Sequence, residues 1–140
     1  MRTAKQSIQE LTNFIPPRQL RFTANLAAHS EEKDYFIAKL DQLATLIAGM
    51  PTTGQTEGQG DKTLAYLHYF YGSCDWYITE KDVGDGSDDL RQHQAYGSAN
   101  LGYGAEFGYI SLPEMFTVPG VELDYHFAPR AISNFPKETA

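Results

Sequence analysis

The sequence predicts an α+β fold in which N-terminal helices pack on an antiparallel β-meander of about five strands. Two patterns carry this prediction: apolar residues recur at helical intervals in the first part of the chain, and after residue 63 apolar and polar residues alternate as in strands. Residues 51–63 lie between the two patterns, contain three glycines and no large apolar residue, and are expected to be a mobile connector. A chain of 140 residues has room for a single domain.

The helices are expected before that connector. Residues 1–29 are expected to form a helical arm that is interrupted at Pro16 and Pro17, because proline lacks an amide donor and restricts the residue before it. Pro17 can then serve as the first residue of a second short helix. Ser30 is the expected N-cap of the main helix, residues 30–50, and the acidic residues after it complement the helix dipole. The apolar stripe of this helix consists of Phe36, Leu40, Leu43 and Ile47.

The sheet is expected over residues 64–127. Residues 64–71 are nearly all apolar or aromatic, as in a central strand, and a turn at Gly72-Ser73 joins them to an alternating strand over 75–81 as a hairpin. One face of this second strand is expected to carry Trp76, Ile78 and Glu80, and the other Tyr77 and Thr79. Later strands are expected at 94–99, 106–111 and 121–127, a helical turn capped by Ser111 at 111–114, and a tail at 128–140.

The charge of the chain is unevenly distributed. The net charge is −7, yet residues 1–29 hold four basic residues against one acidic residue, and residues 64–127 hold ten acidic residues against two basic ones. Eight of the nine tyrosines and the only tryptophan also lie in 64–127. An acidic surface repels nucleic-acid phosphates and attracts basic partners. The sequence therefore disfavours direct nucleic-acid binding. The acidity either attracts a basic partner or only keeps a small protein soluble.

The composition also argues against several classes of protein. A single cysteine, Cys74, excludes an intramolecular disulfide, and it has no basic neighbour that would activate its thiol. No apolar run approaches the roughly 20 residues that a membrane-spanning helix needs. The start of the sequence lacks the apolar stretch of a signal peptide. We therefore expect a cytoplasmic protein that does not enter a membrane.

No motif for catalysis or for a cofactor is evident. The acidic loop at residues 82–89 has the composition of a calcium loop, but it lacks the spacing and the final glutamate, and a solvated connector is the better interpretation. The spacing of a zinc site is also missing among the candidate ligands, which are His68, Glu80, Glu122, Asp124 and His126. No metal or other cofactor is expected.

Three motifs in the second part of the chain resemble a known family. Residues 76–80 read WYITE, residues 107–114 read FGYISLPE and residues 121–127 read VELDYHF. In this order they resemble the small bacterial family catalogued as domain of unknown function 2958, and Ile15-Pro16-Pro17 with Leu20 and Asn25 is similar to the opening of that family. The resemblance implies a protein of plasmids, phages or other mobile elements, and it implies no catalytic residue.

The aromatic and acidic residues of the sheet are the candidate binding residues. An antiparallel sheet needs only one face for its core, so some of these tyrosines are expected on an outer surface, and tyrosine and tryptophan are enriched at interfaces. The candidate partner-binding residues are Tyr66, His68, Tyr77, Glu80, Asp82, Asp85, Asp88, Asp89, Tyr103 and Glu106.

These features favour a non-enzymatic, acidic binding protein of a mobile element that engages a basic surface of a host protein. A nucleic-acid-binding defence enzyme, of restriction or CRISPR type, is the expected target class, with carboxylates in the place of phosphates. Two alternatives stay open. A pocket between helix 30–48 and the sheet, lined by His68, Tyr77, Glu80 and His126, would make the chain a small enzyme or a ligand-binding domain. Exposed aromatics would otherwise pair with a second copy in a structural homodimer.

Overall fold

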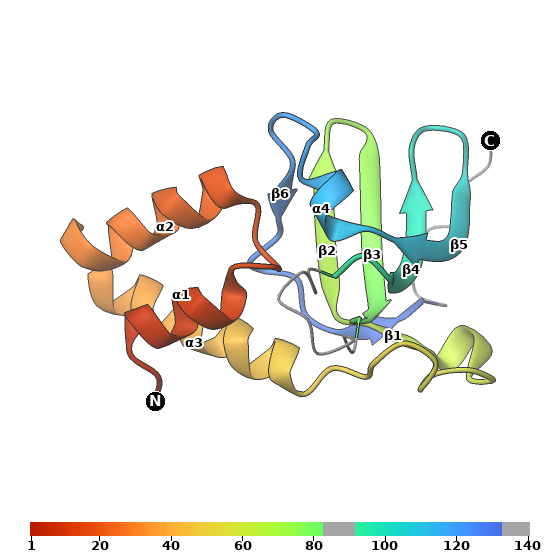
Figure 1. Ribbon diagram of the computed structural model, residues 1–140, viewed down its shortest axis with the longest axis horizontal. Coiled ribbons are helices and arrows are strands. Elements are labelled where there is room, and N and C mark those ends of the chain that lie inside the picture. The colour runs from red at the N-terminus through yellow and green to blue at the C-terminus, as the bar shows by residue number, and fades with distance from the viewer. Residues whose placement is uncertain (83–91, 133–140) are drawn as a thin grey trace. The chain divides into compact units, whose positions relative to one another are not determined.

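The computed structural model describes residues 1–82 and 92–132, and it divides the chain into two compact units, Met1–Gly49 and Met50–Ala140 (Figure 1). The first unit is helical, and the second contains a five-stranded antiparallel sheet. The predicted fold class, α+β, is confirmed. Among the described residues, no helix has the length and apolar character that crossing a membrane requires.

The helical unit consists of α1 (Ala4–Leu11), α2 (Pro17–His29) and α3 (Lys33–Ala48), and α3 packs against both of the others. Helix α1 begins at a capping box, in which the Thr3 side chain accepts from the Gln6 N–H and the Gln6 side chain accepts from the Thr3 N–H. The buried apolar residues of the three helices are Leu11, Leu20, Ala27, Leu40, Leu43, Ala44 and Ile47. The predicted stripe of the main helix is therefore largely buried.

The helix boundaries confirm one local prediction and correct another. Pro17 is the first residue of α2, as expected. Ser30, however, is not the N-cap of the next helix, which begins at Lys33. The Ser30 hydroxyl donates to the carbonyl oxygen of Leu26 at 2.7 Å and accepts from the Glu32 N–H at 3.2 Å. The hydroxyl thus supplies a hydrogen-bond donor to a carbonyl in the last turn of α2. Serine side chains often bond to a nearby backbone group in this way.

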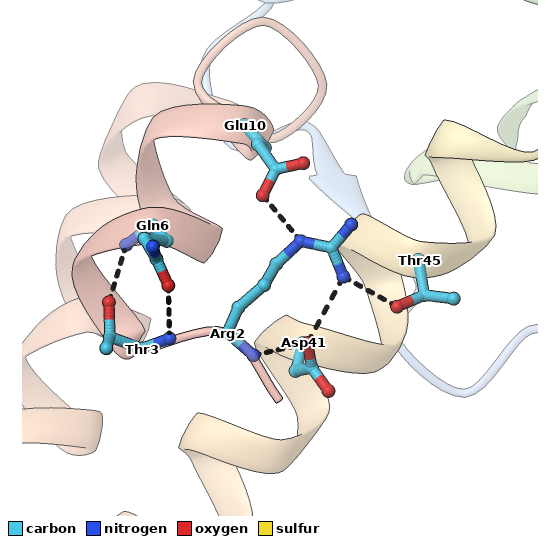
Figure 2. Close-up of polar contacts among 6 residues, drawn as sticks. All are labelled: Arg2, Thr3, Gln6, Glu10, Asp41 and Thr45. Atoms are coloured by element: carbon cyan, nitrogen blue, oxygen red, sulfur yellow. Dashed lines mark hydrogen bonds and ion pairs between the residues drawn. The ribbon is translucent and has the colours of Figure 1, made fainter.

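Arg2 joins α1 to α3 through polar contacts (Figure 2). Its backbone N–H donates to Asp41 Oδ1 at 3.2 Å, and its guanidinium donates to the Glu10 carboxylate, to Asp41 and, at 2.7 Å, to the Thr45 hydroxyl. The backbone N–H of Arg2, assisted by the guanidinium, holds the pKa of Asp41 below its usual value. Two carboxylates of this unit, on α1 and α3, therefore pair with the one guanidinium of Arg2.

The main sheet has the strand order β5-β4-β3-β2-β6. Its strands are β2 (Leu67–Tyr71), β3 (Cys74–Glu80), β4 (Ala95–Asn100), β5 (Ala105–Ile110) and β6 (Glu122–Leu123). The strands β2 to β5 form a meander, and β6 returns to the far side of β2, where it pairs antiparallel. The predicted hairpin is confirmed, because Tyr71 pairs with Cys74 across the turn at Gly72-Ser73.

Two predicted strands differ from the observed ones. The run 64–71 is divided at Tyr66 into β1 (Leu64–Ala65) and β2, and β1 pairs with β7 (Arg130–Ala131) in a separate two-stranded sheet. The prediction of a last strand over 121–127 is wrong beyond β6. Asp124 instead caps a turn, where its side chain accepts from the His126 N–H at 2.9 Å, so these two side chains do not share a strand face.

The apolar face of the sheet carries the core of the second unit. Its buried side chains include Leu67, Tyr69, Trp76, Ile78, Ala95, Ile110 and Leu123. Tyr69 is fully buried against Phe116, with ring centroids 5.8 Å apart, and burial raises the pKa of its phenol far above the usual value. Phe116 directly follows α4 (Leu112–Met115), a turn capped by Ser111 as its spacing predicted.

Candidate functional site

The second face of the sheet is polar and aromatic. A row of paired residues crosses it from β2 to β5, since residues opposite each other in register project from the same face: His68, Tyr77, Ser98 and Phe107. Beside this row Tyr96 pairs with Tyr109, and their rings meet edge to face with centroids 5.6 Å apart. We call the surface formed by these six residues the polar–aromatic face.

The polar–aromatic face borders two hollows. The first, here called the aromatic cleft, has a volume of about 510 Å³. The rings of Tyr96, Phe107 and Tyr109 line the part formed by the sheet. The part formed by the connector is lined by Thr53, Gly54, Thr56, Glu57, Gly58, Gly60 and Thr63. Thr79, Glu80 and Ile132 complete its lining. A volume of this size lies within the roughly 300–1,000 Å³ that is usual for ligand sites.

A β-bulge in β3 places Glu80 at the aromatic cleft. Ile78 pairs with Gly97 and Glu80 pairs with Tyr96, so Thr79 is an additional residue in β3. In a regular strand Glu80 would share the apolar face with Ile78, as the alternation predicted. That prediction is wrong because the bulge re-aims the side chain to the face that carries Tyr96.

The Glu80 carboxylate anchors the connector to the end of β3. The side chain is only 3% exposed, and its oxygens accept from the Gly54 N–H at 2.8 Å, from the Thr56 N–H at 2.8 Å and from the Thr56 hydroxyl. A second pair of bonds joins the Thr53 N–H to the Lys81 carbonyl and the Lys81 N–H to the Pro51 carbonyl. The connector expected to be mobile is thus bonded to the sheet.

The second hollow, here called the histidine cleft, has a volume of about 420 Å³ and centres on His68. The His68 ring stacks on Tyr77 with centroids 4.5 Å apart. Its Nε2 lies 2.7 Å from Asp75 Oδ1, and its Nδ1 lies 3.3 Å from Asp124 Oδ2. Carboxylates accept and do not donate, so both contacts are hydrogen bonds at once only when the imidazole carries two protons.

Phe127 and Arg130 close the histidine cleft. The Phe127 ring lies 5.7 Å from that of His68 and 5.8 Å from that of Tyr77, measured between centroids, and the Arg130 guanidinium lies over Phe127 at 5.4 Å. Burial, reinforced by the charge of Asp75, raises the pKa of Tyr77 although Arg130 opposes the shift. This cleft therefore contains a cation of the chain itself.

The polar residues of the predicted pocket are divided between the two clefts. His68, Tyr77 and His126 line the histidine cleft, whereas Glu80 lines the aromatic cleft. Both clefts belong to the sheet unit.

Large exposed side chains gather on the hairpin formed by β4 and β5. Their exposed fractions are 54% for Leu101, 90% for Tyr103, 52% for Phe107 and 68% for Tyr109. Among residues 1–82 and 92–132, strand β5 is an edge of the sheet, and Glu106 is exposed on it. The candidates Tyr103 and Glu106 thus both belong to this hairpin, but Glu106 projects from the face of β5 opposite to that of Phe107 and Tyr109. Sequence reasoning missed Leu101, Phe107 and Tyr109 as candidates, because the alternation of 107 and 109 becomes informative only once β5 is known to be an edge.

Two further candidates, Tyr66 and Asp82, are described at other positions of the sheet unit. Tyr66 is half-buried between β1 and β2, and its N–H donates to the Ile78 carbonyl at 2.8 Å. Asp82 accepts from the Gln94 N–H at 3.2 Å. Three acidic candidates, Asp85, Asp88 and Asp89, lie outside the described residues.

Within residues 1–82 and 92–132 no three His, Cys, Asp or Glu side chains are grouped so that they could hold a metal ion. No family model, curated protein or solved structure matches the chain. The resemblance to domain of unknown function 2958 stays a prediction.

Proposed function

We propose that this chain is a non-enzymatic binding protein that engages a basic surface of another protein through the β4–β5 hairpin. The observation that carries the proposal is the exposure of three aromatic side chains, Tyr103, Phe107 and Tyr109, at the edge of the sheet. Monomeric proteins rarely expose such contiguous apolar groups, and a patch of this kind rimmed by polar residues is typical of an interaction site.

The charge of the sheet unit supports a basic partner. Residues 50–140 contain thirteen acidic and five basic residues, whereas residues 1–49 contain five acidic and six basic ones. Complementary charge accelerates association and selects partners of the opposite sign. The partner surface is therefore expected to be rich in lysine and arginine, and binding is expected to weaken as salt screens the charges.

The backbone of β5 supports the same surface. Edge strands are usually protected by lysine, proline or a bulge, because their free N–H and C=O groups can pair with another chain. Strand β5 reads AEFGYI, with Glu106 as its one charge. A strand of the partner can add to this edge, and its side chains would then meet the exposed rings.

The narrower role is proposed on the sequence alone. A protein of a mobile element that inhibits a nucleic-acid-binding defence enzyme would present carboxylates where the enzyme normally receives phosphates. The negative charge of residues 50–140 and the family resemblance support this role.

The test is capture of proteins from a bacterial lysate on the immobilised chain at low and at high salt. A triple variant (Tyr103→Ser, Phe107→Ser, Tyr109→Ser) removes the rings of the hairpin. The matched control carries Phe22→Ser and Tyr35→Ser in the helical unit, where these side chains are 66% and 50% exposed. We expect basic proteins on the wild type and the control at low salt, and none on the triple variant.

Two results would contradict the proposal. Capture that is insensitive to salt would contradict the electrostatic argument. Equal capture by the triple variant would show that the hairpin is not the binding surface. Light scattering tests the homodimer directly. A wild-type dimer that the triple variant abolishes would assign the hairpin to a second copy of the chain instead.

A further inference from the structure

Three aromatic rings form one wall of the aromatic cleft. Tyr96 and Tyr109 meet edge to face at an interplanar angle of 80°, and Phe107 projects from the same face of the sheet. Phe107 and Tyr109 are more than half exposed, so a ligand can reach them. The face of an aromatic ring carries partial negative charge and attracts a cation placed above it.

Carboxylates lie on the other side of the cleft. Glu57 is exposed at its rim, and the buried Glu80 carboxylate is held by the N–H groups of Gly54 and Thr56. Those donors are neutral, and Glu80 forms no ion pair with any described residue. Its negative charge is therefore stabilised by hydrogen bonds and not cancelled. A cation in the cleft would be attracted by both the rings and the carboxylates, and partial exclusion of water strengthens such an attraction.

The histidine cleft provides an internal comparison. There the chain places its own cation, Arg130, over the ring of Phe127. No lysine, arginine or histidine is found among the described residues that line the aromatic cleft. The two clefts thus share rings and carboxylates, and they differ in whether the chain supplies the cation.

We infer that the aromatic cleft binds the cationic side chain of an arginine or lysine that the partner presents, with the cation over the rings of Phe107 and Tyr109 and close to Glu57 and Glu80. An anionic ligand is disfavoured by the same two carboxylates. The inference rests on the proposed function, since it names what a basic partner inserts, but the cleft can be examined without that partner.

The first experiment titrates the full chain with N-acetyl-arginine amide, and with N-acetyl-citrulline amide as the uncharged analogue of equal shape. Amide chemical shifts report where each probe binds. We expect saturable shifts at Gly54, Gly58 and Tyr109 with a Kd on the order of 1 mM for the arginine probe, as is usual for so small a ligand. Citrulline is expected to bind about tenfold more weakly, because it lacks the cation.

Two variants test the walls separately. Tyr109→Leu removes a ring and is expected to weaken the arginine probe about tenfold, whereas Glu57→Gln removes an exposed charge and is expected to weaken it about twofold to threefold, with a larger effect at low salt. The matched control is Tyr71→Leu, since Tyr71 is 46% exposed in the same unit and does not line the cleft. It is expected to leave the affinity unchanged.

The outcomes separate this inference from the proposed function. Equal affinity for citrulline, shifts confined to the histidine cleft, or an unchanged affinity in Tyr109→Leu would overturn the inference. Arginine binding in the cleft without any captured basic protein would uphold the inference and reject the proposed function. Salt-sensitive capture on the hairpin without arginine binding in the cleft would do the reverse.

Discussion

The carboxylates described in the helical unit and in the sheet unit differ in the groups that they bond to. In the helical unit, Glu10 and Asp41 meet the guanidinium of Arg2, so negative charge is cancelled locally (Figure 2). In the sheet unit, Glu80 meets only neutral donors among the described residues, and Asp75 and Asp124 share one imidazole.

This difference concerns where charge is available to a partner. Ion pairs within a unit leave little field outside it, whereas carboxylates held by neutral hydrogen bonds keep their charge and project it. The exposed aromatic side chains of the β4–β5 hairpin belong to the same sheet unit as the uncancelled carboxylates. In the sheet unit, Glu80 and the exposed rings therefore lie in one compact unit, whereas Glu10 and Asp41 of the helical unit have their charge offset by Arg2.

The largest expected effect concerns the bulge that keeps Glu80 at the aromatic cleft. A Cβ at Gly97 would lie 1.9 Å from the Tyr77 carbonyl oxygen, so Gly97→Ala must displace β3 from β4. We expect a loss of about 3 kcal/mol in the free energy of unfolding, at the upper end of overpacking effects. Urea denaturation measures it.

Gly108 is the matched control for this substitution. It pairs directly with Gly97 in β5, and a Cβ there would have no neighbour within 4 Å. We expect Gly108→Ala to change stability by less than about 0.5 kcal/mol. An equal loss of stability in both variants would show that the short distance between position 97 and the Tyr77 carbonyl is not the reason for the glycine there.

The second effect concerns the neutral donors around Glu80. Glu80→Ala would leave the N–H groups of Gly54 and Thr56 without their acceptor, and we expect a loss of about 2–3 kcal/mol. Faster hydrogen exchange of those amides would accompany it. Glu57→Ala, at an exposed position of the same connector, is expected to stay within about 0.5 kcal/mol of the wild type. A similar loss in both variants would remove the anchoring role of Glu80.

The smallest effect is expected at the ion pairs of the helical unit. The folded-state pKa of Asp41 lies below its usual value of 3.8, so its contribution to stability is fully present above that pH. The contribution disappears as the pH falls through the lowered pKa. Asp41→Asn should lower the stability of the helical unit near neutral pH and remove this acid dependence, as unfolding followed by circular dichroism at several pH values would show. Arg2→Ala should only reduce the acid dependence, because it removes the guanidinium and keeps the backbone N–H that is the main cause of the lowered pKa. An unchanged acid dependence in Asp41→Asn would contradict the assignment.

Features governed by neighbours in sequence were predictable. The hairpin at Gly72-Ser73, the start of α2 at Pro17 and the cap at Ser111 each depend on the conformational preferences of a few adjacent residues. The prediction of Ser30 as an N-cap was wrong, because a serine hydroxyl can bond to the helix before it or to the helix after it. Here the hydroxyl donates to the Leu26 carbonyl at the end of α2 and does not cap α3.

The candidate site was predictable only in part. Tyr103 and Glu106 were identified from the concentration of aromatic and acidic residues, and they do lie on the exposed hairpin. The aromatic cleft was not anticipated, because it is formed by residues 53–63 and by rings more than thirty positions later. Such proximity depends on which distant strands pair with each other, and the alternation of residues within one strand does not reveal that.

By itself the sequence determined the α+β class, the placement of helices before strands and the negative charge of the second unit. These features depend on the composition and the apolar periodicity of continuous segments, which can be read from the sequence directly. Tertiary structure alone decided that β5 is an edge, that the chain leaves the sheet after Leu123 and that Glu80 turns to the aromatic cleft. The physical reason is that each of these features depends on which strand lies beside which, and a single additional residue at Thr79 reverses the face of every side chain that follows it in the strand.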